Sequence, residues 1–391
     1  MANTVAALNP EKWMSNVQDF LNAMLLSEGI AESRMFDGMV KSGDAINFPY
    51  INDMRVQSYT PGTDLTIDDF TATQSTLTIN RSKAATLYVD PQELAQAEDK
   101  GYAEKLARQA AFVLAQELDQ NVLGTGVTAA AASSVTGGTL SASTIYTKLT
   151  EAMANLDREN ATDGPMFAVL DPERVALLAQ SEVANGFNVA DTALKNGFVG
   201  DSQAGFKVFK SNNLPTSQTI TMPTIPTATD TMTIGGVTWT FVASGAAAVA
   251  GEISIGANIA ATKVNIPLAL NGTGTPGATT YIEISTANRR KYQNMQLTCA
   301  AFSSDNCTVT AYGKLNWTED VTPTDCVVGT ETTQILTGRV GAISVARQMR
   351  PELYIKPVAA QLGDNYITHQ LYGSTVFYRD TFRLATITHN A

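Results

Sequence analysis

The sequence predicts an α+β fold, and three stretches carry the prediction. An acidic, threonine-rich segment at residues 43–90 alternates apolar and polar residues as extended strands do. A stretch with helical periodicity follows at residues 98–124, and helix-like and strand-like stretches then alternate up to residue 215. Because an extended arm with few apolar residues is not stable alone in water, we expect it to lie on a partner.

The composition limits the function classes. The chain has 391 residues, 44% of them hydrophobic and 16% charged, which is enough for two or three domains with cores. So low a charge density suits a surface that neighbouring subunits cover. The net charge of -11 argues against tight, sequence-independent binding to nucleic acid, although a local basic patch stays open.

The termini and cysteines give no sign of secretion. The first residues lack the basic start and apolar core of a signal peptide, and no run of about 18 apolar residues is present. We therefore expect synthesis in the cytoplasm and no membrane span. Cys299, Cys307 and Cys326 do not have the number or spacing of a disulfide framework or a zinc site. We expect free, part-buried thiols, with Cys299 and Cys307 able to meet across a hairpin.

The N-terminal half predicts helices around the arm. Residues 10–34 carry an apolar stripe at helical spacing, with Asn9 as a cap. Within the arm we expect strands at 45–50, 54–59, 76–80 and 84–89. The long helix should end at Gly124, and the Gly/Ala/Ser/Thr-rich stretch after it predicts a flexible linker or surface loop.

The middle of the chain predicts a compact α+β region and then an insertion. We expect a helix at 144–160, a buried strand at 166–170, a helix begun by Asp171 and Pro172, and a strand at 206–210. From about residue 216 to 337 the composition shifts to Thr, Ala and Gly, which predicts a separate, mainly β domain. Gly235 and Gly236 predict a hairpin turn there, residues 258–271 a short helix, and the residues around the cysteines two strands.

The order of these elements, with strand-like sequence returning at 338–391, resembles the major capsid (coat) proteins of tailed bacteriophages, whose fold is shared by herpesvirus capsid floors. The segments SGDAINFPY, LYVDPQELAQAED, GFKVFKSNNLP and ITHQLYGSTVFYRD carry the resemblance, over residues 1–215 and 338–391. The inserted sequence TMTIGGVTWTFVASG looks like a β-rich module of phage structural proteins.

The resemblance implies a shell subunit with five parts. They are an N-terminal helical arm (1–42), an extended β loop over a neighbour (43–90), a peripheral domain with the spine helix 98–124 (91–160), an axial domain with return strands (161–215 and 338–391) and the inserted surface domain (216–337). It implies a virion protein that self-assembles as pentamers and hexamers into an icosahedral head around double-stranded DNA. Expected partners are a scaffolding protein, the portal protein, a possible decoration protein and, weakly and non-specifically, the packaged DNA.

Charged residues suggest where subunits meet. The arm carries Asp64, Asp68 and Asp69, which we expect to contact basic residues of a neighbour such as Arg339, Arg347 and Arg350. The reverse pairing would use Arg81 and Lys83. A metal site and a merely solvated loop are the alternatives for the arm acids. The run Arg289, Arg290 and Lys291 has a nucleic-acid role as its alternative, but a solvated loop fits it better.

Enzymatic chemistry finds little support. The only histidines are His369 and His389, and no Walker loop, GxSxG or HExxH motif occurs. We therefore expect no catalytic residue, no cofactor and no metal. The other classes that stay open are a tail-tube or other virion protein, the shell of a cellular cargo compartment, and a hydrolase or sugar-binding protein on a β scaffold.

Overall fold

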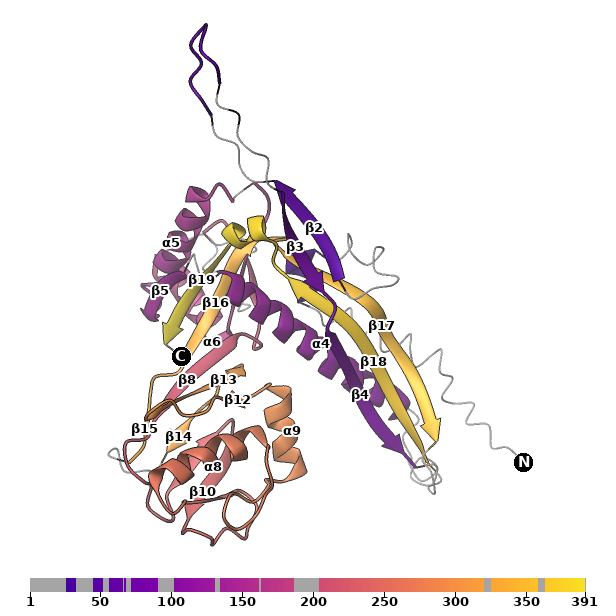
Figure 1. The fold of residues 1–391 in the computed structure, drawn as a ribbon, viewed down its shortest axis with the longest axis vertical. Coiled ribbons are helices and arrows are strands. Elements are labelled where there is room, and N and C mark those ends of the chain that lie inside the picture. Colours follow the sequence, from indigo (N-terminus) through magenta and orange to yellow (C-terminus); the bar gives the residue numbers. More distant parts are fainter. Residues whose placement is uncertain are drawn as a thin grey trace, which may run out of the picture. The chain divides into compact units, whose positions relative to one another are not determined.

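The elements fall into two compact units. The computed structural model describes residues 26–32, 45–51, 56–65, 67, 72–90, 102–130, 134–161, 163–185, 204–319, 325–357 and 363–390. The first unit takes residues 1–115 and 341–381, and the second takes 116–340 and 382–391. The boundary falls within the long helix α4 (Tyr102–Ala129), shown in Figure 1.

A four-stranded sheet organises the first unit. Its order is β1 (Ala31–Glu32), β17 (Ile343–Pro357), β18 (Asp364–Thr375) and β4 (Arg81–Val89). Strand β1 follows the short helix α2 (Ser27–Ile30) and pairs parallel to β17, whereas the other pairs are antiparallel. In Figure 1 the long strands β17, β18 and β4 run side by side.

One face of this sheet is buried. Tyr366, Thr368, Gln370 and Tyr372 alternate along β18 with residues that are only half-buried, as expected for a strand with one covered face. The Gln370 amide donates to the Leu114 carbonyl of α4 at 3.3 Å. The buried amide thus has a partner, and the first half of α4 lies on this face.

A two-stranded ribbon stands beside the sheet. Strands β2 (Ala45–Ile51) and β3 (Ala72–Thr78) pair antiparallel. Because two strands alone are marginally stable, the ribbon needs a support. A small cluster at its base supplies one: Leu77, Ile79 and Ala346, with Ile46, Phe48, Leu371 and Phe377 packed against them. Phe48 and Phe377 place their ring centroids 4.9 Å apart.

The second unit is built on a nine-stranded sheet. The main path runs β12 (Thr298–Cys299), β13 (Asn306–Tyr312), β8 (Pro215–Thr221), β16 (Thr332–Arg339), β19 (Leu384–Asn390) and β5 (Ser134–Thr139). Off this path, β6 (Met166–Leu170) pairs with β16 and with β7 (Lys207–Lys210), and β15 (Val327–Val328) pairs with β8. Helix α5 (Ile145–Arg158) lies against β19, β5 and helix α6 (Pro172–Asn185). Between β18 and β19, residues Tyr378–Arg383 form the 3-10 helix η2.

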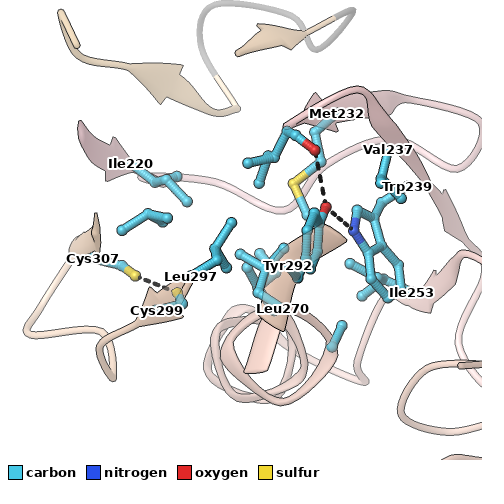
Figure 2. Close-up of a cluster of buried hydrophobic side chains, with 14 of the residues drawn as sticks. Ile220, Met232, Val237, Trp239, Ile253, Leu270, Tyr292, Leu297, Cys299 and Cys307 are labelled. Carbon is cyan, nitrogen blue, oxygen red and sulfur yellow. Dashed lines mark hydrogen bonds between the residues drawn. The ribbon is translucent and has the colours of Figure 1, made fainter. Parts of the chain in front are cut away.

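Buried side chains between residues 220 and 326 form one hydrophobic cluster. A second sheet in the order β11 (Glu252–Ser254), β10 (Val237–Val242), β9 (Thr231–Ile234), β14 (Thr318–Glu319) packs with helices α8 (Ile259–Asn271) and α9 (Thr286–Asn294). Trp239 and Tyr292 lie at the centre of this cluster, which Figure 2 shows. Gly235 and Gly236 both have positive φ, 58° and 73°, so the predicted hairpin turn is confirmed.

The long helix runs further than predicted. We expected it to end at Gly124, but it continues to Ala129. The reason is packing, since a Cβ on Gly124 would collide with the hydroxyl of Tyr312. This glycine lets a side chain approach the helix and does not end it. The expected linker is also wrong, because Ser134–Thr139 form β5, paired parallel to β19.

Several other boundaries differ from the prediction. Residues 56–59 are not a strand, while 54 and 55, and residues 10–25 of the predicted N-terminal helix, lie outside the described part of the chain. The segments 161–215 and 338–391 were expected to form one domain with return strands. Strands β6 and β7 of the first segment and β19 of the second belong to the nine-stranded sheet, but β17 and β18 pair with each other and β18 with β4 in the other sheet. Helix α5, expected beside the spine helix in one peripheral domain, packs in the core of the second unit. The segment 216–337, expected to be a separate, mainly β insertion, contains two helices, and β8 and β16 at its ends belong to the nine-stranded sheet.

Candidate assembly surfaces

The tip of the arm exposes apolar side chains. Because β2 and β3 are antiparallel, residues 52–71 connect them at one end of the ribbon. Among the described residues there, Val56 is fully exposed and Ile67 is 91% exposed, and Tyr59 and Leu65 are more than half exposed. Thr63 donates its amide to the Thr60 carbonyl at 3.1 Å, which forms a turn at Pro61 and Gly62. Exposed apolar side chains gathered on one loop mark a contact site for another protein surface.

The predicted acidic residues belong to the same loop. Asp64 is exposed next to Leu65. Asp68 and Asp69 lie outside the described residues, so their part in a contact remains a prediction. Across the described ranges, no three His, Cys, Asp or Glu side chains come together in a way that could hold a metal ion.

Two of the predicted basic partners already have a carboxylate in the same chain. Arg339, at the end of β16, lies 2.9 Å from Asp163, and Arg347, on β17, lies 3.1 Å from Glu28. Both carboxylates are solvent-accessible, so each pair contributes about 0–1 kcal/mol. Arg350 lies on the same strand as Arg347.

Arg81 and Lys83 are half-buried on β4. They pair with Tyr372 and Gln370 of β18, on the covered face of the sheet. Ser82 between them points to the other face, where its hydroxyl forms a 2.8 Å hydrogen bond with Nε2 of His369. The two basic residues therefore lie on the opposite face of the sheet from His369, which ties β18 to β4.

A buried ionic cluster at the C-terminal strand was not predicted from the sequence. His389 on β19 is buried, and its Nδ1 lies 3.0 Å from the Arg174 guanidinium of α6. Arg174 also donates to the Asn390 carbonyl at 2.5 Å, and Asp171 lies 3.6 Å from both Nη1 of Arg174 and Nε2 of His389. Burial lowers the pKa of His389 below its ordinary value, and the Arg174 charge acts in the same direction. The cluster pins the C-terminal strand to the start of α6.

A further ion pair lies beside this cluster. Glu173 accepts from Lys314 at 2.6 Å, and this hydrogen bond holds the pKa of the Glu173 carboxyl below its ordinary value. The contact links α6 to the loop after β13 in the second unit. No sequence signal could have shown either cluster, because the partners are far apart in the chain and no motif marks them.

Comparison with solved structures places the fold. A chain from Mycobacterium phage Che8 matches with a TM-score of 0.53 at 12% identity, over 94% of this chain and 91% of that one. A chain from the capsid structure of the cyanophage P-SCSP1u matches with a TM-score of 0.50 at 14% identity, over 90% and 85%. The chain has the fold of phage capsid proteins.

The capsid fold confirms the α+β class expected from the order of elements. No protein-family model matches the sequence, and neither does any curated protein. Among the described residues, no helix combines the length and the apolar character needed to cross a membrane.

Proposed function

We propose that this chain is the major capsid protein that self-assembles into the icosahedral head of a tailed phage. The observation that carries the proposal is the likeness to phage chains, which spans at least 85% of both molecules in each comparison. A match of that extent leaves little of the chain for a different task. The exposed apolar side chains on the arm loop support the proposal, because a subunit that stayed alone would leave them in water.

The parts of the subunit follow from the same proposal. The arm loop would lie on a neighbour, and the nine-stranded unit would gather at the five-fold and six-fold positions as pentamers and hexamers. Residues 216–337 would form a surface domain available to a decoration protein. A scaffolding protein and a portal would take part in assembly. Since the chain carries a net charge of -11, contact with packaged DNA would be weak and non-specific.

Electron microscopy of the purified full-length chain tests the proposal. The chain is expressed alone and together with the genes that flank it, and particles are separated by sedimentation. Closed icosahedral shells are the expected result. Tubes would assign the chain to a tail, and a monomer under both conditions would overturn the proposal.

The arm loop offers a sharper test. A Val56→Asn and Ile67→Asn double variant removes the most exposed apolar side chains of the loop, which make no core contact. If both side chains are buried on a neighbouring subunit, each substitution removes about 1.5–3 kcal/mol of association free energy at every such contact. That loss is enough to abolish shells at ordinary protein concentrations. Val249→Asn is the matched control, because Val249 is 63% exposed and belongs to the inserted segment instead of the arm.

The readouts separate assembly from folding. Sedimentation counts shells, while circular dichroism and thermal melting report the fold of the subunit. We expect the double variant to melt like the parent chain and to form no shells, with Val249→Asn forming them normally. Normal shells from the double variant would show that the arm loop is not an assembly contact.

The charge of the arm is tested separately. We infer that Asp64, Asp68 and Asp69 guide the arm onto basic residues of a neighbour, which affects the rate and register of docking more than its affinity. Asp68→Lys with Asp69→Lys should slow or prevent shell formation without unfolding the subunit. A normal assembly rate at low salt would contradict this role.

A further inference from the structure

Two cysteine side chains face one another in the inserted segment. The sulfurs of Cys299 and Cys307 lie 2.9 Å apart, and both residues are buried (Figure 2). Cys299 sits on the edge strand β12 and Cys307 on the adjacent strand β13. Sulfurs this close need only a small side-chain rotation to reach the bonded separation of about 2.05 Å.

The backbone holds the pair in place. The side-chain amide of Asn271, at the end of α8, makes two hydrogen bonds to the backbone of Cys299. It accepts from the Cys299 amide at 2.8 Å and donates to the Cys299 carbonyl at 2.9 Å. Cys307 is held by its ladder position opposite Ile220 in β8. The turn between the strands is closed by reciprocal amide–carbonyl bonds of Ser303 and Asn306. The two sulfurs are therefore positioned before any bond forms.

A cleft borders one of the two cysteines. A cavity of about 490 Å³ opens between α8 and the turn after β12, and Cys299 is part of its wall beside Leu268 and Phe302. Lys263 of α8 bridges the cleft to the turn through Asp305 at 2.7 Å. Cys299 therefore borders a space large enough for a small molecule, and Cys307 does not line it.

The electrostatics of the pair favour a state in which the two sulfurs share one proton. The hydrogen bond between the sulfurs raises the pKa of the Cys299 thiol and lowers the pKa of the Cys307 thiol. Cys307 is accordingly the sulfur that gives up its proton first and accepts from Cys299. A zinc site does not explain the pair, because zinc needs further ligands and the described part of the chain offers no third His, Cys, Asp or Glu beside it.

We propose that Cys299 and Cys307 are a redox-active dithiol that closes to a disulfide when a small peroxide enters this cleft. Cys307 first loses its proton to solvent, and Cys299 passes its own proton to the Cys307 thiolate as the Cys299 sulfur attacks one peroxide oxygen. The proton released to solvent is the one that the leaving hydroxide later takes up. The O–O bond breaks, the leaving hydroxide takes up a proton to become water, and Cys299 is a sulfenic acid. Cys307 then attacks the Cys299 sulfur and displaces its hydroxyl as a second water. Two thiols and one hydrogen peroxide give one disulfide and two waters.

The disulfide would fasten the edge of the nine-stranded sheet. It joins β12 to β13 and closes a short ring that contains one rim of the cleft. Loop-closure entropy predicts that the melting temperature of the second unit rises by roughly 5–10 °C on oxidation. If the chain forms shells, particles would gain this bond after leaving the reducing cytoplasm, a consequence that rests on the proposed function. The chemistry itself needs only the folded chain.

The wild-type subunit provides the first test, before any assembly. The reduced, unassembled chain is treated with hydrogen peroxide, denatured, alkylated with N-ethylmaleimide and digested at aspartate. Cleavage before Asp305 and Asp325 places each cysteine in a separate peptide. We expect the Cys299 and Cys307 peptides to be linked and Cys326 to be alkylated. Three alkylated cysteines, or a link to Cys326, would overturn the proposal whether or not the chain forms shells.

Variants supply the matched control. Cys326→Ser removes a buried thiol whose pKa burial raises to about 12 and which should stay inert. This variant and the parent should both melt higher after oxidation, whereas Cys299→Ser and Cys307→Ser should not change. A rise that persists in Cys299→Ser would contradict the assignment. Peptide mapping of the parent decides the question even if a serine variant does not fold.

Discussion

Removing one oxygen atom from the core of residues 216–337 should destabilise it strongly. The Tyr292 hydroxyl accepts from Nε1 of Trp239 at 2.9 Å and donates to the Ile234 carbonyl at 3.1 Å. Trp239 and Tyr292 are 0% and 2% exposed, so water cannot replace either bond. In Tyr292→Phe the ring stays, but a buried indole N–H loses its partner and the Ile234 carbonyl loses one of its bonds (Figure 2).

The size of the effect follows from the orphaned indole N–H and the lost carbonyl bond. A buried polar group without a partner costs about 1–3 kcal/mol and an ordinary hydrogen bond about 1 kcal/mol, so the variant should lose roughly 2–4 kcal/mol of unfolding free energy. Tyr281→Phe is the matched control. Its hydroxyl makes one bond, at 3.0 Å to the carbonyl of Thr273, an exposed residue where water can replace the bond. That change should cost about 1 kcal/mol.

Urea unfolding of the unassembled chain measures both variants. With a slope of about 2 kcal/mol per molar, the Tyr292→Phe midpoint should fall by roughly 1–2 M while the slope stays the same. Far-UV circular dichroism and tryptophan fluorescence should move together. A midpoint within error of the parent, or above that of Tyr281→Phe, would refute the reasoning that these bonds hold the core.

Two further predictions concern stability. Burial lowers the pKa of His389, so the unfolded chain binds a proton at higher pH than the folded one. The unfolding free energy should fall as pH drops below about 6.5, and His389→Gln should flatten that dependence when urea midpoints are measured from pH 5 to 8. A slope unchanged in the variant would show that other groups cause it. Asn258 caps α8 by accepting from the Ala261 amide at 2.9 Å, so Asn258→Ala should cost about 1 kcal/mol in the same assay and Asn258→Ser much less. Equal losses for both would exclude the cap.

Local sequence signals predicted local structure correctly. The hairpin of β9 and β10 follows from two glycines between alternating strands, and the start of α6 follows from Asp171 and Pro172. Both depend on residues within a few positions of each other. Pairing between strands that lie far apart in the sequence left no such local signal. Strand β5 lies in a Gly- and Ser-rich stretch and becomes a strand only because β19, from the other end of the chain, lies beside it.

The same division applies to the assembly surfaces. The lack of a core in the arm is a local property, and the sequence shows it directly. Its consequence, exposed Val56 and Ile67, is what the structure displays. The sequence of one chain does not show which basic residue the arm acids would contact, because that depends on two surfaces. Opposite charge alone is a poor guide, since Arg339 and Arg347 already have carboxylates nearby in their own chain. Since those surface pairs are weak, we expect that, if the arm docks on a neighbour, burial of its apolar side chains contributes more to the free energy of docking than the ion pairs do and that charge affects the register.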